Sequence, residues 1–84
     1  MAHIQLRYFA SLREQLGVEE ECLNVPETLS TLADLRDWLA GEQGRQSLMT
    51  AKNLRCALNQ ELCSFETPFG EGDEVAFFPP VTGG

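Results

Sequence analysis

Alternating apolar and polar residues predict a half-buried strand near the start of the chain. Between His3 and Phe9, the side chains of Ile4, Leu6 and Tyr8 fall on one face, because successive side chains of a strand point to opposite sides. Phe9 departs from this pattern and places an aromatic ring on the polar face. The segment therefore predicts one strand with a buried face and one aromatic residue left over on the other face.

Two helices are predicted from their start signals and from the spacing of their leucines. Ser11 and Glu14 have the spacing of a capping box, and Gly17 is a natural end for the short helix that follows. Thr31 is expected to cap the principal helix, with Asp34 in its positively polarised first turn. The apolar stripe of this helix consists of Leu32, Leu35 and Leu39, with Trp38 at its edge.

Four further strands are predicted in the remainder of the chain. They cover residues 22–25, 54–58, 62–65 and 74–78. Asn59 and Gln60 are expected to turn between the second and the third of them, and the acidic residues 19–21 are expected to form a solvated turn. The order strand, helix, strand, helix, strand, strand, strand predicts an α+β domain with one helical layer on a mixed sheet.

Length and composition limit the kinds of function that the chain can have. With 84 residues, of which 43% are hydrophobic and 23% charged, it has the composition of one small globular domain. A domain of this size rarely holds both a complete core and a deep catalytic pocket. A carrier, a binding module or one subunit of an assembly is therefore expected.

The charge balance limits the partners. Thirteen acidic residues against six Lys and Arg give a net charge of −7. Nucleic acids and anionic membranes are bound largely through Lys and Arg, so neither is expected as a partner. A protein with a basic surface is the expected partner. No stretch resembles a signal peptide or a membrane span, so we expect a cytoplasmic protein.

The cysteines do not indicate a disulfide framework or a metal site. Cys22, Cys56 and Cys63 are odd in number and contain no C-x-x-C pair. We expect them to be reduced, half-buried thiols. A catalytic thiol needs a positioned base, and the one histidine is His3, near the N-terminal end of the chain. A Cys–His nucleophile is therefore disfavoured, and no metal ligands are assigned.

Residues 79–84 predict an extended tail that follows a domain of residues 1–78. Two consecutive prolines open the tail and direct it away from the sheet, because proline has a fixed φ and no N–H to donate. When extended, six residues reach about 20 Å. Gly83 and Gly84 have no Cβ, so the tail can enter a narrow channel. The carboxylate of Gly84 is expected to be ionised and to react only after a partner enzyme activates it.

Three segments of the sequence carry a resemblance to a known family. The C-terminal run Gly-Asp-Glu-Val-Ala-Phe-Phe-Pro-Pro-Val-Thr-Gly-Gly, residues 72–84, is the most specific of them. It strongly resembles the MoaD-type sulfur carriers, the small subunits of molybdopterin synthase. Residues 7–14 and 58–60 also look like this family. The resemblance implies a β-grasp, ubiquitin-like fold, in which one main helix crosses a mixed sheet.

The resemblance also implies a function for the terminal glycine. In that family an E1-like enzyme uses ATP to adenylate this residue, and a sulfur donor converts the acyl-adenylate to a thiocarboxylate. The tail then enters a large catalytic subunit and gives sulfur to cyclic pyranopterin monophosphate, which forms the molybdopterin dithiolene. Carried over by position, Gly84 holds the sulfur, and no bound cofactor is expected. The small subunit is non-catalytic, and two small and two large subunits form a heterotetramer.

A docking surface is predicted beside the tail. Strand alternation leaves Phe9 and Phe78 pointing away from the core, and Leu62 on an adjoining strand is expected to join them. The resemblance implies docking by this sheet face. The residues expected to contact the partner are Phe9, Leu62, Phe78, Pro79, Pro80, Val81, Thr82 and Gly83.

Three alternative functions remain open at this point. A thiamine-pathway sulfur carrier has the same fold and chemistry, but such chains look shorter and lack the Phe-Phe-Pro-Pro run. A ubiquitin-like protein modifier would join Gly84 to other proteins by an isopeptide bond and would form covalent ladders in cells. A stand-alone binding domain with an inert tail would tolerate deletion of Gly83 and Gly84.

Overall fold

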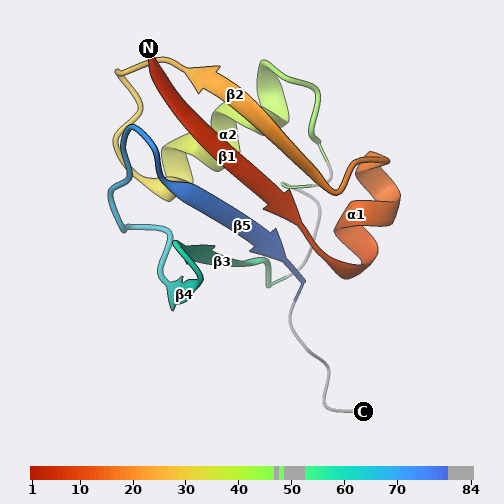
Figure 1. Ribbon diagram of the computed structural model, residues 1–84. Helices are drawn as coiled ribbons and strands as arrows, with labels where there is room; N and C mark the ends of the chain where they lie inside the picture. Colours follow the sequence, from red (N-terminus) through yellow and green to blue (C-terminus); the bar gives the residue numbers. More distant parts are fainter. Residues whose placement is uncertain (47, 49–52, 80–84) are drawn as a thin grey trace.

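The structure is a computed structural model that describes residues 1–46, 48 and 53–79. Within these residues, five strands and two helices follow one another in the predicted order (Figure 1). They are β1 (Ala2–Tyr8), α1 (Ala10–Leu16), β2 (Glu20–Val25), α2 (Leu32–Gly41), β3 (Arg55–Leu58), β4 (Glu61–Cys63) and β5 (Glu74–Phe78). The tail beyond Pro79 lies outside the described residues, so the domain boundary after residue 78 stays a prediction.

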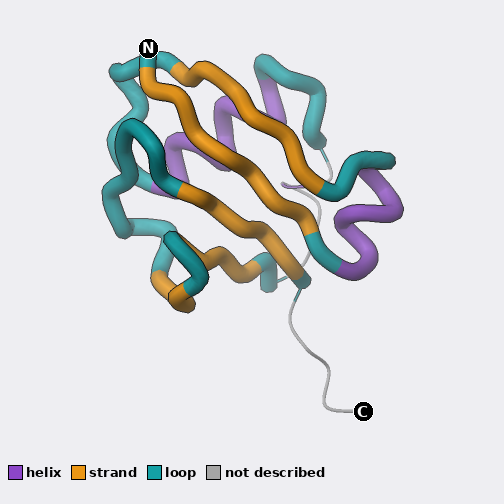
Figure 2. The backbone as a smooth tube through the Cα atoms, viewed as in Figure 1, coloured by secondary structure: helices purple, strands orange, loops and turns teal. Residues whose placement is uncertain are grey.

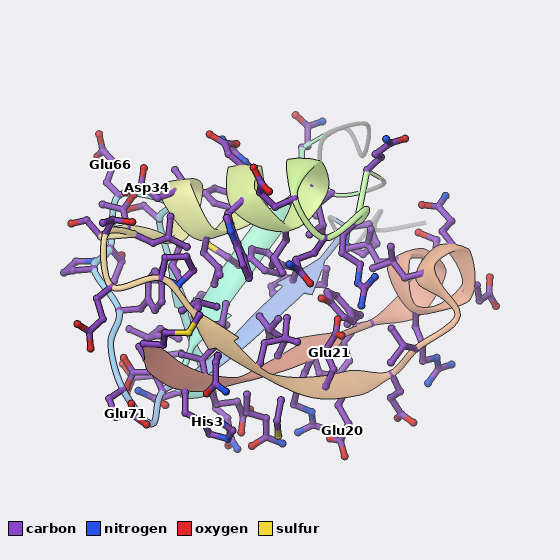
Figure 3. All side chains as sticks on the ribbon, turned by 90° about the horizontal axis from the view of Figure 1, so that it is seen from above. His3, Glu20, Glu21, Asp34, Glu66 and Glu71 are labelled. Atoms are coloured by element: carbon purple, nitrogen blue, oxygen red, sulfur yellow. The ribbon has the colours of Figure 1, made fainter. Side chains whose placement is uncertain are left out.

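The five strands form one mixed sheet in the order β2-β1-β5-β3-β4 (Figure 2). The first and last strands, β1 and β5, are parallel neighbours, with Leu6 opposite Val75. The other three strand pairs are antiparallel. Helix α2 lies across one face of this sheet (Figure 3). One helix crossing a mixed sheet whose first and last strands are paired is the β-grasp architecture, so the expected fold class is confirmed.

The core lies between the sheet and α2. Ile4, Leu6 and Tyr8 have no exposed surface, as the alternation in β1 predicted. The α2 stripe is buried against them, and the complete cluster consists of Ile4, Leu6, Tyr8, Leu12, Val25, Leu32, Leu35, Leu39, Leu48, Cys56, Val75 and Phe77. One face of β1 and β5 is buried against α2, so the side chains of their other face do not take part in this core.

Thr31 caps the start of α2, as the sequence predicted, and together with Asp34 it forms a capping box. The Thr31 hydroxyl accepts a hydrogen bond from the backbone N–H of Asp34 at 3.3 Å, and the Asp34 carboxylate accepts one from the N–H of Thr31 at 3.1 Å. Two donors that the first helical turn leaves unpaired are thereby satisfied. The hydrogen bonds that the Asp34 carboxylate accepts from the backbone N–H groups of Thr31 and Ser30 lower the pKa of Asp34 from its ordinary value.

The predicted start of α1 is wrong. The helix begins at Ala10, its N-cap is Phe9, and no side chain caps it. The reason is that Phe9, directly after β1, keeps an extended backbone: its N–H donates to the carbonyl of Phe77 at 3.3 Å, and the chain turns immediately afterwards at Ala10, where φ is +54°. Ser11 consequently lies inside the first turn. The predicted end is confirmed, because Gly17 adopts the left-handed conformation with φ of +73°.

The bounds of β1 and β3 differ from the prediction by one residue at an end, and those of β2 and β4 differ more. Glu20 and Glu21 belong to β2 rather than to a solvated turn, because they pair with Arg7 and Leu6 and continue the antiparallel ladder. Strand β4 covers Glu61–Cys63 instead of residues 62–65, because the chain turns again after Cys63, with the N–H of Thr67 bonded to the carbonyl of Ser64. The two-residue turn between β3 and β4 is confirmed, with φ of +50° at Asn59 and +71° at Gln60.

Candidate docking groove and C-terminal tail

An open groove of about 440 Å³ lies on the face of the sheet opposite α2. Its floor is formed by Ala57 of β3 and Ala76 of β5, which are paired across the sheet. Both alanines are less than 10% exposed. Because their side chains are single methyl groups, the sheet surface is low here between larger neighbours. The complete lining is Arg7, Phe9, Ala57, Gln60, Leu62, Glu74, Ala76 and Phe78.

The three residues predicted to form a docking surface all line this groove. Phe9 follows the end of β1, Phe78 ends β5, and Leu62 lies at the centre of β4. The rings of Phe9 and Phe78 meet edge to face, with centroids 6.5 Å apart. Phe9 is 41% exposed and Leu62 75% exposed, whereas Phe78 is half-buried. The predicted faces are therefore confirmed, while the binding of a partner by these residues stays a prediction.

Arg7, on the polar face of β1, lines the groove and was not among the residues predicted to form the docking surface. Its guanidinium lies over the ring of Phe9, 5.5 Å from the centroid, and it is 3.8 Å from the Glu20 carboxylate and 3.9 Å from that of Glu74. Its Nε is buried without a hydrogen-bond partner among the described residues. Because the guanidinium is attracted to the face of the ring, this contact favours one position of the Phe9 side chain. The place of Arg7 two residues before Phe9 on the chain was the signal that could have identified it.

The tail begins at one end of the groove. Phe78 lines the groove as the last residue of β5, and Pro79 follows it directly as the last described residue. The other residues expected in the tail, Pro80, Val81, Thr82, Gly83 and Gly84, lie outside the described residues. A partner seated on the groove would therefore meet the start of the tail at the same place.

The described residues contain no group of three or more His, Cys, Asp or Glu side chains placed to hold a metal ion. His3, near the start of β1, pairs through Nδ1 with the Asn24 side-chain oxygen at 3.1 Å. Of the thiols, Cys56 is buried and Cys63 half-buried, but Cys22 is exposed. The expectation of half-buried thiols is therefore met by Cys63 alone. Cys22 is exposed because it lies on the outer face of β2, which pairs only with β1 at the edge of the sheet, and Cys56 belongs to the core. No helix in the described part of the chain is long and apolar enough to cross a membrane.

Comparison with known sequences identifies a family and several relatives. Residues 6–84 match the model of the ThiS family. The molybdopterin synthase sulfur carrier subunit of Escherichia coli is 42% identical over 82 residues, which cover 96% of this chain and 99% of the relative. The protein of the same name from Haemophilus influenzae is 37% identical over 82 residues, with the same coverage.

Comparison with solved structures supports the same fold. The small archaeal modifier protein 1 of H. volcanii superposes with a TM-score of 0.78 at 26% identity, and the match covers 96% of this chain and 100% of that one. A chain from the complex of subunits 1 and 2 of the molybdopterin-converting factor of Helicobacter pylori gives a TM-score of 0.64 at 26% identity and covers 98% of this chain and 99% of that one. Both matches span essentially the whole β-grasp domain.

Proposed function

Because this chain belongs to the ThiS family, we propose that it is the sulfur-carrier subunit of a molybdopterin synthase and acts in the cytoplasm. The observation that carries the proposal is the 42% identity to a molybdopterin synthase sulfur carrier subunit over 96% of the chain. The sequence of the tail and the groove beside its first residue support the same assignment. The thiamine-pathway alternative is disfavoured, since the relatives compared above are named for molybdopterin synthase.

In this proposal the reactive group is the terminal carboxylate of Gly84. A carboxylate oxygen attacks the α-phosphorus of ATP on an E1-like enzyme, which releases pyrophosphate and leaves an acyl-adenylate. A sulfur donor then displaces AMP and leaves a thiocarboxylate. The carboxylate is already ionised at neutral pH, so this chain needs no general base of its own. The activating groups belong to the partner enzyme, in agreement with a chain too small for a deep catalytic pocket.

The second partner in this proposal is the large catalytic subunit, which receives the tail. The Helicobacter pylori structure is a complex of subunits 1 and 2 of a molybdopterin-converting factor. The exposed Phe9 and Leu62, with Phe78 beside them, give this chain an apolar surface for such a partner. The net charge of −7 favours a basic partner surface around it. Sulfur transfer to cyclic pyranopterin monophosphate takes place in the large subunit, within a heterotetramer of two small and two large subunits.

The test is the intact mass of the protein after incubation with ATP, an activating enzyme and a sulfur source. The mass should rise by the difference between one sulfur atom and one oxygen atom. Cleavage after glutamate releases residues 75–84, which contain Gly84 but no cysteine, and this peptide should carry the increase. A variant without Gly84 is the control and should keep its mass. An increase that maps to a cysteine-containing peptide would contradict the proposal.

A second candidate function is a ubiquitin-like modifier that is joined to other proteins. The observation that favours it is the TM-score of 0.78 to a protein named as a small archaeal modifier. Conjugation would produce a ladder of covalent adducts of a tagged chain in cells, and the ladder would disappear when Gly84 is removed. A sulfur carrier without conjugating activity would give no ladder and would still support sulfur transfer in the presence of the large subunit.

A further inference from the structure

Cys56 and Cys63 face each other across the hairpin formed by β3 and β4. The two-residue turn at Asn59 and Gln60 places Leu58 opposite Glu61, and two positions further on it places Cys56 opposite Cys63. The two Sγ atoms are 3.9 Å apart, and both cysteines are free thiols. Two thiols at this separation form a pair rather than two isolated small hydrophobic residues.

The register of this hairpin is compatible with a disulfide. Directly opposite residues of an antiparallel pair have Cα atoms about 4.5–5.5 Å apart, and disulfides span Cα distances of about 4.4–6.8 Å. Opposite residues also project to the same side of the sheet, so the two Cβ atoms point the same way. A bond between Cys56 and Cys63 therefore needs side-chain rotation but no change in strand register.

The two thiols differ in their access to solvent. Cys56 is 1% exposed and directs its thiol toward the carbonyl oxygen of Cys63 at 3.4 Å. Burial, and after it the neighbouring thiol of Cys63, raises the pKa of Cys56. Cys63 is half-buried and lies on β4, which is the edge strand of the sheet. A small reagent from solvent therefore reaches the Cys63 thiol first. The Cys56 thiol is less accessible and remains protonated.

We propose that Cys56 and Cys63 form a reversible dithiol–disulfide site that is oxidised by small peroxides. The Cys63 sulfur attacks one oxygen of hydrogen peroxide, which leaves Cys63 as a sulfenic acid and releases one water. The Cys56 sulfur then gives up its proton and attacks the Cys63 sulfur. The S–O bond breaks and a second water leaves. Two thiols and one peroxide thus become one disulfide and two waters, and a dithiol reductant reverses the change. This site goes beyond the proposed sulfur-carrier function and does not rest on it.

Oxidation of Cys56 and Cys63 would act on the hairpin formed by β3 and β4. Cys56 and Cys63 pack against the core, on the α2 side of the sheet. The neighbouring pair, Ala57 and Leu62, projects to the other side and lines the groove. The disulfide would fix the register of the hairpin that carries Leu62, without occupying the groove itself.

The test uses the full chain with Cys22→Ser, because the exposed Cys22 could otherwise join two molecules. On treatment with hydrogen peroxide, the folded protein should lose about 2 Da, the mass of two hydrogen atoms. Cleavage after Glu42, Glu61 and Glu66 would leave residues 43–61 and 62–66 joined until dithiothreitol separates them. The matched control adds Cys56→Ser: Cys63 should then gain about 16 Da as a sulfenic acid that a sulfenate-specific reagent traps. Adding Cys63→Ser instead should leave Cys56 unreacted over the same time.

Three results would overturn the proposal. The first is a gain of oxygen on Cys63 of the two-cysteine protein without loss of the two hydrogens. The second is formation of the bond only after denaturation, which would mean that the native hairpin does not hold the two thiols in place. The third is oxidation of Cys56 at an unchanged rate when Cys63 is replaced, because the order of attack argued above requires Cys63 to react first.

Discussion

The guanidinium of Arg45 holds the carboxylate of Glu21 through two hydrogen bonds, from Nη2 to Oε1 at 2.7 Å and from Nε to Oε2 at 3.1 Å. The Tyr8 hydroxyl donates a third hydrogen bond to Oε2 at 2.7 Å. Burial, followed by the contact with Glu21, raises the pKa of Tyr8, which therefore remains a donor at neutral pH. Glu20 and Glu21 project to opposite sides of β2 (Figure 3), which is why only Glu21 reaches this network. The three residues connect the chain after α2 to the sheet.

This network makes stability depend on pH through Glu21. Burial raises the pKa of Glu21, but the hydrogen bonds from Arg45 and Tyr8 outweigh burial and hold the pKa below its ordinary value of 4.5. A carboxyl group that is more acidic in the folded state stabilises that state above its unfolded pKa. The contribution is lost as the pH falls from about 4.5 through the folded pKa.

Glu21→Gln should therefore lower the free energy of unfolding by about 1–3 kcal/mol at neutral pH, since charged hydrogen bonds are lost in a partly buried place. The difference from the unmodified protein should shrink as the pH falls from about 4.5 and should disappear below the folded pKa of Glu21, where both chains are neutral at this position. Denaturant titrations at a series of pH values from neutral to acid measure this difference in the free energy of unfolding. Glu20→Gln is the matched control and should change stability little, because its pairing with Arg7 is at 3.8 Å on an exposed side chain. A difference that stays constant with pH would contradict the assignment.

Phe77→Ala and Phe78→Ala should affect different properties of the protein. Phe77 is fully buried and stacks on Phe65 with centroids 6.2 Å apart, so its removal should cost about 3–5 kcal/mol of stability. Phe78 lines the groove, so its removal should weaken binding to the large subunit by roughly 2 kcal/mol or more if it is a central contact. Melting curves and calorimetric titrations of both variants measure this. Normal binding by Phe78→Ala would show that the groove is not the docking site. An earlier melting of Phe78→Ala than of Phe77→Ala would contradict the assignment of the two rings to opposite faces of β5.

Gly83→Val should leave the fold intact and block activation or transfer of sulfur. A branched side chain narrows the allowed φ values and adds bulk where we propose that the tail enters a channel. The readouts are the melting temperature and the amount of sulfur delivered in the presence of both partners. Gly70→Val serves as control, because a Cβ at Gly70 meets no atom within 4 Å, and it should transfer sulfur normally. Unchanged transfer by Gly83→Val would refute the threading proposal.

Thr31→Ala and Ser11→Ala should separate a real helix cap from an apparent one. Thr31 accepts the N–H of Asp34, and loss of such a cap typically costs about 0.5–2 kcal/mol. Ser11 lies inside α1, which has no side-chain cap, so replacing it with alanine should leave stability unchanged or slightly higher. Thermal unfolding of the two variants measures the difference. Equal destabilisation by both would mean that Ser11 caps α1 after all.

The features that the sequence predicted correctly depend on neighbouring positions in the chain. The burial of Ile4, Leu6 and Tyr8 follows from alternation within one strand, and the cap at Thr31 needs only Asp34 three residues later. The groove residues Phe9 and Phe78 could be grouped because alternation gives the face of each strand. Their use by a partner, and the chemistry of Gly84, rest on the family and stay predictions.

The features that the sequence did not predict depend on partners far away in the chain. Glu21 was assigned to a solvated turn because nothing near it indicates Arg45, which lies 24 residues later. Ser11 had a good capping pattern, but the hydrogen bond from the N–H of Phe9 to the carbonyl of Phe77 keeps Phe9 extended beside β5. The helix therefore begins at Ala10, and Ser11 lies inside its first turn. The Cys56–Cys63 pair is different, because a two-residue turn at Asn59 and Gln60 fixes the register and could have predicted it.

The pairing of β5 with β1 on one side and β3 on the other has a mechanical consequence. Tension applied to the tail acts along β5, and therefore loads the hydrogen bonds to both neighbours in shear. The bonds share the load together and are not peeled apart one after another, as they would be in an edge strand. A partner that binds the C-terminus can thus exert tension on it without detaching β5 from the sheet.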